Sequence, residues 1–263
     1  MSDLPRARSG QSAMEVAVRA VKKAGEVITT RFQGPREVAY KGRGNLVTDV
    51  DRLAEKEILS LLQHEFPGYG ILSEESEAVE GDTGYTWVVD PLDGTRNFAQ
   101  GIPVFSVALA LARGEKVVLG VVYDPLRQEL FSAEAGKGAF CNASPIAVSQ
   151  RPSLYLSTIA FDMGYDYDKA KGTLQFLASA WPGMQALRVM GSAALGVAYA
   201  ACGRVDLYFH HALYPWDFAP GSLLVTEAGG VITDRQGASL PLRPSGLIAS
   251  SPALHDEFLK LSP

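Results

Sequence analysis

Apolar residues recur every three or four positions over residues 14–32, the spacing of one face of an amphipathic helix. Ser12 and Glu15 have the spacing of a capping box, so a first helix is predicted from there to about Phe32. Residues 34–45 predict a charged, glycine-rich loop. A second helix is predicted before a break at residues 64–70. The apolar face expected for the first helix is Met14, Val18, Val21, Gly25 and Ile28, and for the second Leu53, Ile58, Leu61 and Leu62.

The pattern then changes to short apolar runs bounded by Gly, Asp and Pro, which predict strands. Runs at 70–73 and 85–89 are followed by 104–112, 116–125 and 128–136, whose close spacing favours antiparallel hairpins, and 136–142 closes this sheet. From about residue 153, strand and helix patterns alternate. We therefore expect an α+β half with an antiparallel sheet over residues 1–152 and an α/β half over residues 153–263, with one shared core.

Composition narrows the classes of function. Of 263 residues, 47% are hydrophobic and 20% charged, as in ordinary globular proteins. The net charge of −5 offers no basic footprint, so nucleic acid is not an expected partner. The two cysteines are far apart, which predicts reduced thiols rather than a disulfide or zinc site. No apolar run is long enough to cross a membrane and no secretory leader is visible, so a cytoplasmic protein is expected.

The stretch WVVDPLDGTRNF ends an apolar strand with Asp90 and Asp93. Two buried carboxylates repel each other unless a cation lies between them. Pro91 stiffens the turn, so that the Leu92 carbonyl can point the same way, and Gly94 begins a short helix whose N–H groups suit an anion. This pattern indicates a metal-bound phosphate, with a Pro-Asp-Gly turn as the alternative interpretation.

Other acids also follow strands or begin helices. Glu74 and Glu75 follow the strand at 70–73, Asp51 begins the second helix, and Asp217 begins a helix predicted over 217–228. Taken singly, Asp51 and Asp217 are plausible N-caps, and Glu74 and Glu75 fit a solvated loop.

Together these segments resemble a known family. WVVDPLDGTRNF and WDFAPGSLLVTEAGG are similar to the two signatures of the inositol monophosphatase family, and SEES, NLVTDVD, GKGAFCN and GSAA match in the family's order. The resemblance covers nearly the whole chain. It implies a layered αβαβα sugar-phosphatase fold and a magnesium-dependent, lithium-sensitive phosphomonoesterase, usually a homodimer.

The resemblance also implies roles for individual residues. Thr95 and Asp51 would orient the nucleophilic water, and the N–H groups of Gly94 and Thr95 would hold the phosphate. Lys41 would lie near the site. Two or three Mg²⁺ ions would be bound: the first by Glu74, Asp90 and the Leu92 carbonyl, the second by Asp90, Asp93 and Asp217, and a weaker third near Glu74 and Glu75.

The substrate side departs from the family pattern. Gly191, Ser192 and Ala193 would form a wall against the alcohol part of the substrate, or cap a helix through Ser192. His210 stands six residues before Trp216, where inositol phosphatases of the family have a glutamate that binds hydroxyls. It is either a substrate contact or a partly exposed loop histidine. Pro220 was expected in the first turn of its helix, where proline is tolerated.

The expected function is hydrolysis of a small-molecule phosphate ester, a sugar or polyol monophosphate such as inositol 1-phosphate, by two-metal in-line attack of an activated water. Fructose-1,6-bisphosphatase, histidinol phosphatase and nucleotide 3′-phosphatase activities are alternatives within the enzyme class. A regulatory protein-binding role in transcription is an alternative of a different class.

Overall fold

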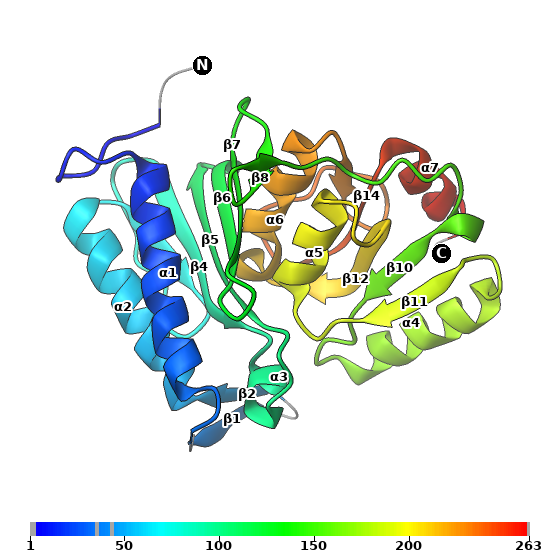
Figure 1. The fold of residues 1–263 in the computed structure, drawn as a ribbon, viewed down its shortest axis with the longest axis horizontal. Helices are drawn as coiled ribbons and strands as arrows, with labels where there is room; N and C mark the ends of the chain where they lie inside the picture. Colours follow the sequence, from blue (N-terminus) through cyan, green and yellow to red (C-terminus); the bar gives the residue numbers. More distant parts are fainter. Residues whose placement is uncertain (1–3, 35–36, 43–44, 262–263) are drawn as a thin grey trace.

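Helical layers and sheets alternate through the molecule in five layers (Figure 1). The computed structural model describes residues 4–34, 37–42 and 45–261, and the structural statements below concern these residues. Two helices cover a seven-stranded sheet, two lie between that sheet and a five-stranded sheet, and two cover the outer face of the second sheet. In that order, the pairs are α1 (Ala13–Arg31) and α2 (Asp49–Glu65), α5 (Ala193–Ala201) and α6 (Pro215–Glu227), and α4 (Tyr167–Ala180) and α7 (Pro252–Leu261). The predicted αβαβα architecture is confirmed.

The first helix begins as predicted but buries a different face. The Glu15 N–H donates to Ser12 Oγ over 3.2 Å, and the Ser12 N–H donates to the Glu15 carboxylate over 2.7 Å. Small residues dominate the buried face, while Met14 and Val18 are half-exposed. The reason is close packing: a Cβ added at Gly25 would lie 2.7 Å from the Tyr123 ring. The buried residues are Ala13, Val16, Ala17, Ala20, Val21, Ala24, Gly25 and Ile28.

The segment between the first two helices was predicted as a loop, and this was wrong. It contains an antiparallel pair of strands, β1 (Val38–Gly42) and β2 (Asn45–Thr48). The apolar residues of this segment, such as Val38, Tyr40 and Leu46, lie among glycines and charged residues. They are too few to predict strands from the pattern alone. In α2, Leu53 is exposed, because the buried face follows Val50, Ala54, Ile58 and Leu62.

The larger sheet has the strand order β3-β4-β5-β6-β7-β8-β9. The predicted antiparallel hairpins are present, and only the β3–β4 pair is parallel among the pairs described in this sheet. Because β3 and β4 run parallel, their carboxyl ends meet at one edge, where Ser73 pairs with Val89. The strands are β3 (Gly70–Ser73), β4 (Tyr85–Asp93), β5 (Ser106–Arg113), β6 (Lys116–Asp124), β7 (Glu129–Glu134), β8 (Ala139–Cys141) and β9 (Ser144–Pro145). The short helix α3 (Thr95–Gln100) follows β4.

The second sheet has the order β11-β10-β12-β14-β13 and is mixed. β10 pairs in parallel with β11 and β12, while β14 pairs antiparallel with β12 and β13. Its strands are β10 (Thr158–Phe161), β11 (Ala186–Val189), β12 (Leu207–Leu213), β13 (Val231–Thr233) and β14 (Ser245–Ser250), preceded by a 3₁₀ turn at Leu154–Leu156. The predicted strand and helix alternation is thus present.

Helix α6 begins two residues earlier than predicted, because Pro215 occupies its first position. Pro220 is therefore the sixth residue of the helix rather than a first-turn residue. This helix lies between the sheets, and a Cβ at Gly120 of β6 would lie 2.3 Å from the Pro220 carbonyl oxygen. The glycine permits this close contact between sheet and helix.

The core between the two sheets draws residues from both halves of the chain. Val88 and Ala108 of the larger sheet pack in one cluster with Leu195 of α5 and Phe218 of α6. The boundary predicted after residue 152 stays a prediction. Both cysteines are free thiols. No described helix is both long and apolar enough to cross a membrane.

Candidate active site

A β-bulge at the end of β4 places two aspartates on one side of the strand. Asp90 lies opposite Ala108 of β5, and Asp93 lies opposite Ser106, so Pro91 and Leu92 together face only Val107. In a regular strand, residues three apart point to opposite faces. The extra residue restores a common direction for Asp90 and Asp93. The strand, predicted to end at residue 89, continues through this bulge to Asp93.

Asp90 is 1% exposed and lacks a full set of hydrogen bonds. Its Oδ1 accepts from the Leu92 N–H over 3.1 Å, whereas its Oδ2 is buried with no donor among the described residues. Burial, and then the charges of nearby carboxylates with Glu74 foremost, raise the pKa of Asp90 well above its ordinary value. A divalent cation is the group that would stabilise the ionised form of this carboxylate.

Asp93 joins the two halves of the molecule. Its carboxylate accepts from Ser106 Oγ over 3.0 Å, from Ser192 Oγ, and from the N–H groups of Ala193 and Ala194 over 2.9 and 3.1 Å. Asp93 thereby satisfies the first N–H groups of α5. Ser192 occupies the N-cap position, yet its hydroxyl donates to Asp93 instead of capping the helix.

Asp217 completes the cluster from the opposite side. Each of Asp90, Asp93 and Asp217 offers a carboxylate oxygen that lies within 4.8 Å of the other two. Asp217 Oδ2 accepts from the Tyr214 N–H over 2.6 Å, so Asp217 holds the third position of α6 rather than its N-cap. The geometry brings together three of the predicted metal ligands, although the roles assigned to them stay predictions.

Glu74 follows β3 at the same edge, where its N–H donates to the Val89 carbonyl over 3.2 Å. It is not one of the three carboxylates that share the 4.8 Å cluster. Its charge nevertheless contributes to the raised pKa values of Asp51 and Asp90. Glu74 therefore lies at the border of the cluster, and Glu75 is the next residue along the chain.

Thr95 and Asp51 are hydrogen-bonded to each other next to the cluster. Thr95 Oγ1 lies 2.9 Å from both Asp51 Oδ1 and the Leu92 carbonyl oxygen, and its one proton can go to only one of them at a time. Asp51 Oδ2 accepts from the N–H and Oγ1 of Thr48, over 2.8 and 2.5 Å. Thr48 is the N-cap of α2, and Asp51 is its capping-box partner. Burial raises the pKa of Asp51 to about 6, against the opposing effect of these hydrogen bonds.

The loop that contains Gly191 is held from two sides. Asp162 Oδ1 accepts from the N–H groups of Met190 and Gly191 over 2.9 and 2.5 Å, and its Oδ2 accepts from Tyr208 Oη over 3.0 Å. The Asn97 amide donates to the carbonyls of the same two residues, over 3.0 and 3.2 Å. Gly94 has a φ of 91°, and a Cβ there would lie 3.1 Å from the Gly191 carbonyl oxygen. Gly94, Gly191, Ser192 and Ala193 are thus packed around Asp93.

His210 belongs to β12 and is 2% exposed, so the alternative of an exposed loop histidine is wrong. Its Nδ1 accepts from the Ala212 N–H over 3.0 Å, and its ring stacks on His211 at 4.7 Å. Burial lowers the pKa of His210 to about 3, so the ring is neutral at physiological pH. A Cβ added at Gly164 would lie 3.0 Å from His210 Cε1, which places Gly164 against this ring. Lys41 lies in β1, and its side chain is outside the described part of the chain.

Several residues of the site give no sequence signal. Glu55 is buried in α2 and accepts from the hydroxyls of Ser73 and Ser76, so it holds the segment that carries Glu74. Asp162 is likewise buried and hydrogen-bonded to the Gly191 loop. Asn97 lies in the stretch WVVDPLDGTRNF, but the stretch itself does not indicate that Asn97 contacts the Gly191 loop. Such single polar residues acquire a role through contacts with distant segments, which no local pattern reveals.

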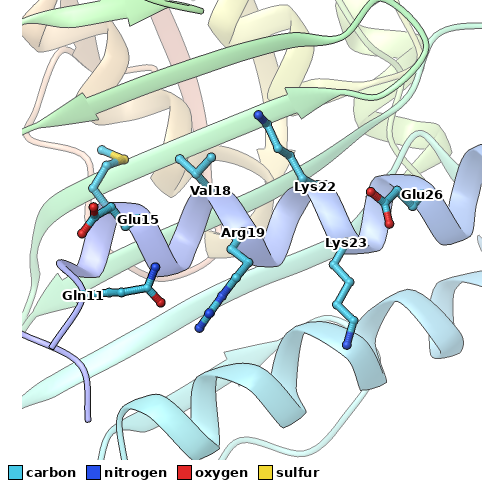
Figure 2. Close-up of a pocket in the computed structure, with 8 residues that line it drawn as sticks. Gln11, Glu15, Val18, Arg19, Lys22, Lys23 and Glu26 are labelled. Carbon is cyan, nitrogen blue, oxygen red and sulfur yellow. The ribbon is translucent and has the colours of Figure 1, made fainter. Parts of the chain in front are cut away.

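A separate hollow of about 620 Å³ lies along the outer face of α1 (Figure 2). Met14 and Val18 line it, together with charged residues such as Arg19 and Lys22. It contains none of the acidic cluster. Arg19 is also ion-paired with Glu65. The hollow is therefore distinct from the candidate active site.

The five alternating layers place a carboxylate cluster that could hold a metal ion where the two halves meet. A family model described as the inositol monophosphatase family matches residues 10–263. The chain belongs to this family and is therefore a phosphoric monoester hydrolase.

Proteins of this family are similar to the chain over nearly its whole length. Inositol monophosphatase 3 of Solanum lycopersicum is 39% identical over 254 residues, which cover 94% of this chain and 95% of the relative. A protein named Nus factor SuhB, from Haemophilus influenzae, is 37% identical over 94% of each chain. The crystal structure of the extragenic suppressor protein suhB from Bartonella henselae has a TM-score of 0.91 at 38% identity, over 94% of this chain and 97% of that one.

Proposed function

We propose that this phosphatase hydrolyses monophosphates of small polyols and sugars, inositol 1-phosphate among them, with Mg²⁺ bound at the acidic cluster. The supporting observation is Asp90 Oδ2, which is buried, has no hydrogen-bond donor among the residues that the structure describes, and belongs to a carboxylate clustered with Asp93 and Asp217. Oxygen ligands of this kind suit Mg²⁺, which prefers carboxylates and water. Glu74 and the Leu92 carbonyl would complete the first site, with a third ion near Glu75.

Two bound ions would supply an activated water and offset the charge on the phosphate and the leaving oxygen. The chain itself supplies proton transfer and orientation. When Thr95 donates its proton to Asp51, its Oγ1 keeps lone pairs that can accept a hydrogen bond from the attacking water. Asp51 is fixed by Thr48, so the Thr95 hydroxyl is held in one direction.

The remaining contacts would hold the ester. We assign the phosphate to the N–H groups of Gly94 and Thr95, and the alcohol to the wall of Gly191, Ser192 and Ala193. Lys41 would lie at the entrance. His210, neutral and buried beneath Gly164, would offer at most one ring nitrogen to a hydroxyl. A homodimer is part of the proposal, and light scattering tests it.

Phosphate release from a panel of esters tests this function. Inositol 1-phosphate, glycerol 2-phosphate, fructose 1,6-bisphosphate, histidinol phosphate and a nucleoside 3′-phosphate would be compared with Mg²⁺, with EDTA and with added lithium. We expect hydrolysis of the first two esters, loss of activity with EDTA and inhibition by lithium. Turnover confined to the last two esters would show that the assigned substrate class is wrong.

A regulatory role in transcription is a second candidate, because relatives at 37% identity are named Nus factor SuhB. The formal charge of −5 favours a protein partner over direct contact with nucleic acid. An Asp90→Asn variant separates the two roles. A transcription phenotype of a deletion strain that this variant restores would support the regulatory role, and failure to restore it would tie the phenotype to catalysis.

A further inference from the structure

A cation and an aromatic ring meet at the seam between the two halves. Arg96 follows Thr95 in α3, and its guanidinium carbon lies 4.4 Å above the centre of the Tyr165 ring. Tyr165 lies between β10 and α4, in the other half of the chain. Figure 1 shows α3 on the side of the larger sheet that faces the end of β10. The contact therefore joins the segment of Thr95, which is proposed to orient the attacking water, to the C-terminal half.

The Tyr165 hydroxyl lies within electrostatic range of the acidic cluster. Although 42% of the residue is exposed, burial is the main cause that raises the pKa of its hydroxyl, so the hydroxyl end points into the protein. The charge of Glu74 is the next largest cause that raises this pKa, and the charges of Asp217 and Asp90 raise it further. The charge of Arg96 lowers it. The hydroxyl is thus at the buried end of the ring, and the Arg96 guanidinium lies on the ring face.

The loop that carries Tyr165 is fixed at its base. Asp162 is anchored to Met190, Gly191 and Tyr208, and Gly164, with a φ of 59°, packs on His210 and His211. Stacking on the ring limits the rotamers of the Arg96 side chain. A guanidinium held in this way can bind an anion in the plane of its N–H groups while its face stays on the ring.

From this arrangement we propose that Arg96, positioned by Tyr165, selects phosphate esters that carry a second anionic group, a carboxylate or a further phosphate, on the alcohol part. The inference rests on the proposed phosphatase function. The reasoning is electrostatic. The bound metal ions would offset the charge of the first phosphate. A second anion on the substrate would lie beyond these ions, where the charges of Glu74 and Asp217 would repel it. The guanidinium provides a permanent positive charge on that side, and bidentate pairing with a carboxylate or phosphate adds direction.

The test compares esters that differ only in the second anion. For a carboxylate, the pair is 3-phosphoglycerate and glycerol 3-phosphate, and for a phosphate it is fructose 1,6-bisphosphate and fructose 1-phosphate. The measured quantity is the ratio of kcat/KM within each pair at saturating Mg²⁺. In Arg96→Gln, we expect this ratio to fall by about one to two decades, the weight of a charge-assisted hydrogen bond. The pair of esters whose ratio falls shows whether the site accepts a carboxylate or a second phosphate.

Two further variants make the result specific. Arg113→Gln removes a guanidinium that also lies over a tyrosine ring, 5.7 Å from the centre of Tyr85 at the opposite end of β4, so its ratios should equal those of the wild type. Tyr165→Phe keeps the ring and should keep the preference, whereas Tyr165→Ala should lose it through a higher KM for the dianionic ester.

Ratios that Arg96→Gln leaves unchanged in both pairs, while the esters are hydrolysed, would overturn the inference and leave the phosphatase function standing. If the wild type hydrolyses inositol 1-phosphate but none of the four esters, the inference fails and the phosphatase function stands. If it hydrolyses neither the four esters nor inositol 1-phosphate and glycerol 2-phosphate, both fail. Equal losses in Arg96→Gln and Arg113→Gln would show a general charge effect and would also overturn it.

Discussion

Asp93 and Ser192, which are 99 residues apart in sequence, are hydrogen-bonded across the seam of the molecule. The carboxylate that is proposed to bind a metal therefore also fixes the start of α5. Ser192→Ala should lower the free energy of unfolding by about 1.5–3 kcal/mol, as expected for a hydrogen bond to a charged group. Urea denaturation without metal measures this. Ser222→Ala is the control, because its hydroxyl donates 2.8 Å to a neutral carbonyl within α6, and an equal loss there would contradict the assignment.

Asp90 and Asp124 are equally buried carboxylates, each 1% exposed, and replacing them with asparagine should have opposite effects on activity and stability. Asp124 is fully partnered by Leu126, Arg127 and the Arg127 guanidinium, so Asp124→Asn should lower Tm and leave kcat near that of the wild type. Asp90→Asn should nearly abolish kcat. In EDTA its Tm should equal or exceed that of the wild type, because a repulsive buried charge is removed. Wild-type turnover in Asp90→Asn would exclude the proposed metal role.

Thr95→Ala should lower kcat by about 10²–10⁴, the usual weight of a positioned proton acceptor. The affinity for Mg²⁺, measured by calorimetry, should change little, because the Thr95 side chain is assigned no metal. Thr95→Ser keeps the hydroxyl and should recover most of the activity. A collapse of metal binding in Thr95→Ala would instead make Thr95 a structural support of the Leu92 carbonyl.

Asp162 should make stability depend on pH. Burial raises the pKa of its carboxyl from an ordinary 3.8 to about 7, so the folded state holds a proton that the unfolded state releases between these values. This contribution to stability is complete below about pH 4 and is lost as the pH rises to about 7. Asp162→Asn resembles the protonated form and should lose this part of the decline, while the parts that come from Asp51 and Asp90 remain. Unfolding free energies at pH 5 and pH 8 in EDTA test this, and parallel changes in both proteins would refute it.

His210→Glu should favour inositol 1-phosphate over glycerol 2-phosphate by about one to two decades in kcat/KM, through one added charged hydrogen bond to a hydroxyl. The structure adds a cost, because the new carboxylate would be buried beside His211, and Tm should fall. His210→Gln is the neutral control. If the ratio of the two esters is unchanged in His210→Glu, the selectivity for the alcohol lies in Gly191–Ala193 instead.

The sequence was most informative where chemistry and local pattern coincide. Asp90, Asp93 and Asp217 stand at the end of a strand and the start of a helix, where a run of apolar residues makes an acid conspicuous. The structure brings these three together. Strand and helix order was predictable for the same reason, since each run is long enough to show its period.

Other features depended on tertiary contacts. The buried face of α1 follows alanines, which count little in a pattern of large apolar residues, because Gly25 allows the helix to pack closely on Tyr123. Asp162 and Asn97 hold the Gly191 loop from segments far away in sequence. Arg96 meets Tyr165 only because α3 and the loop after β10 face each other. None of these contacts produces a periodic pattern or a motif spacing in the sequence.

The β-bulge at Pro91 and Leu92 has a consequence for variation in chain length. Deleting one of these two residues would give a regular ladder in which the aspartates are two positions apart and still share a face. The Leu92 carbonyl oxygen, which lies 2.9 Å from Thr95 Oγ1, would then be absent or point elsewhere. No side-chain substitution redirects a backbone carbonyl in this way. The ligand proposed at Leu92 therefore depends on the number of residues in this segment, and insertions or deletions there affect the centre even when every acidic residue is retained.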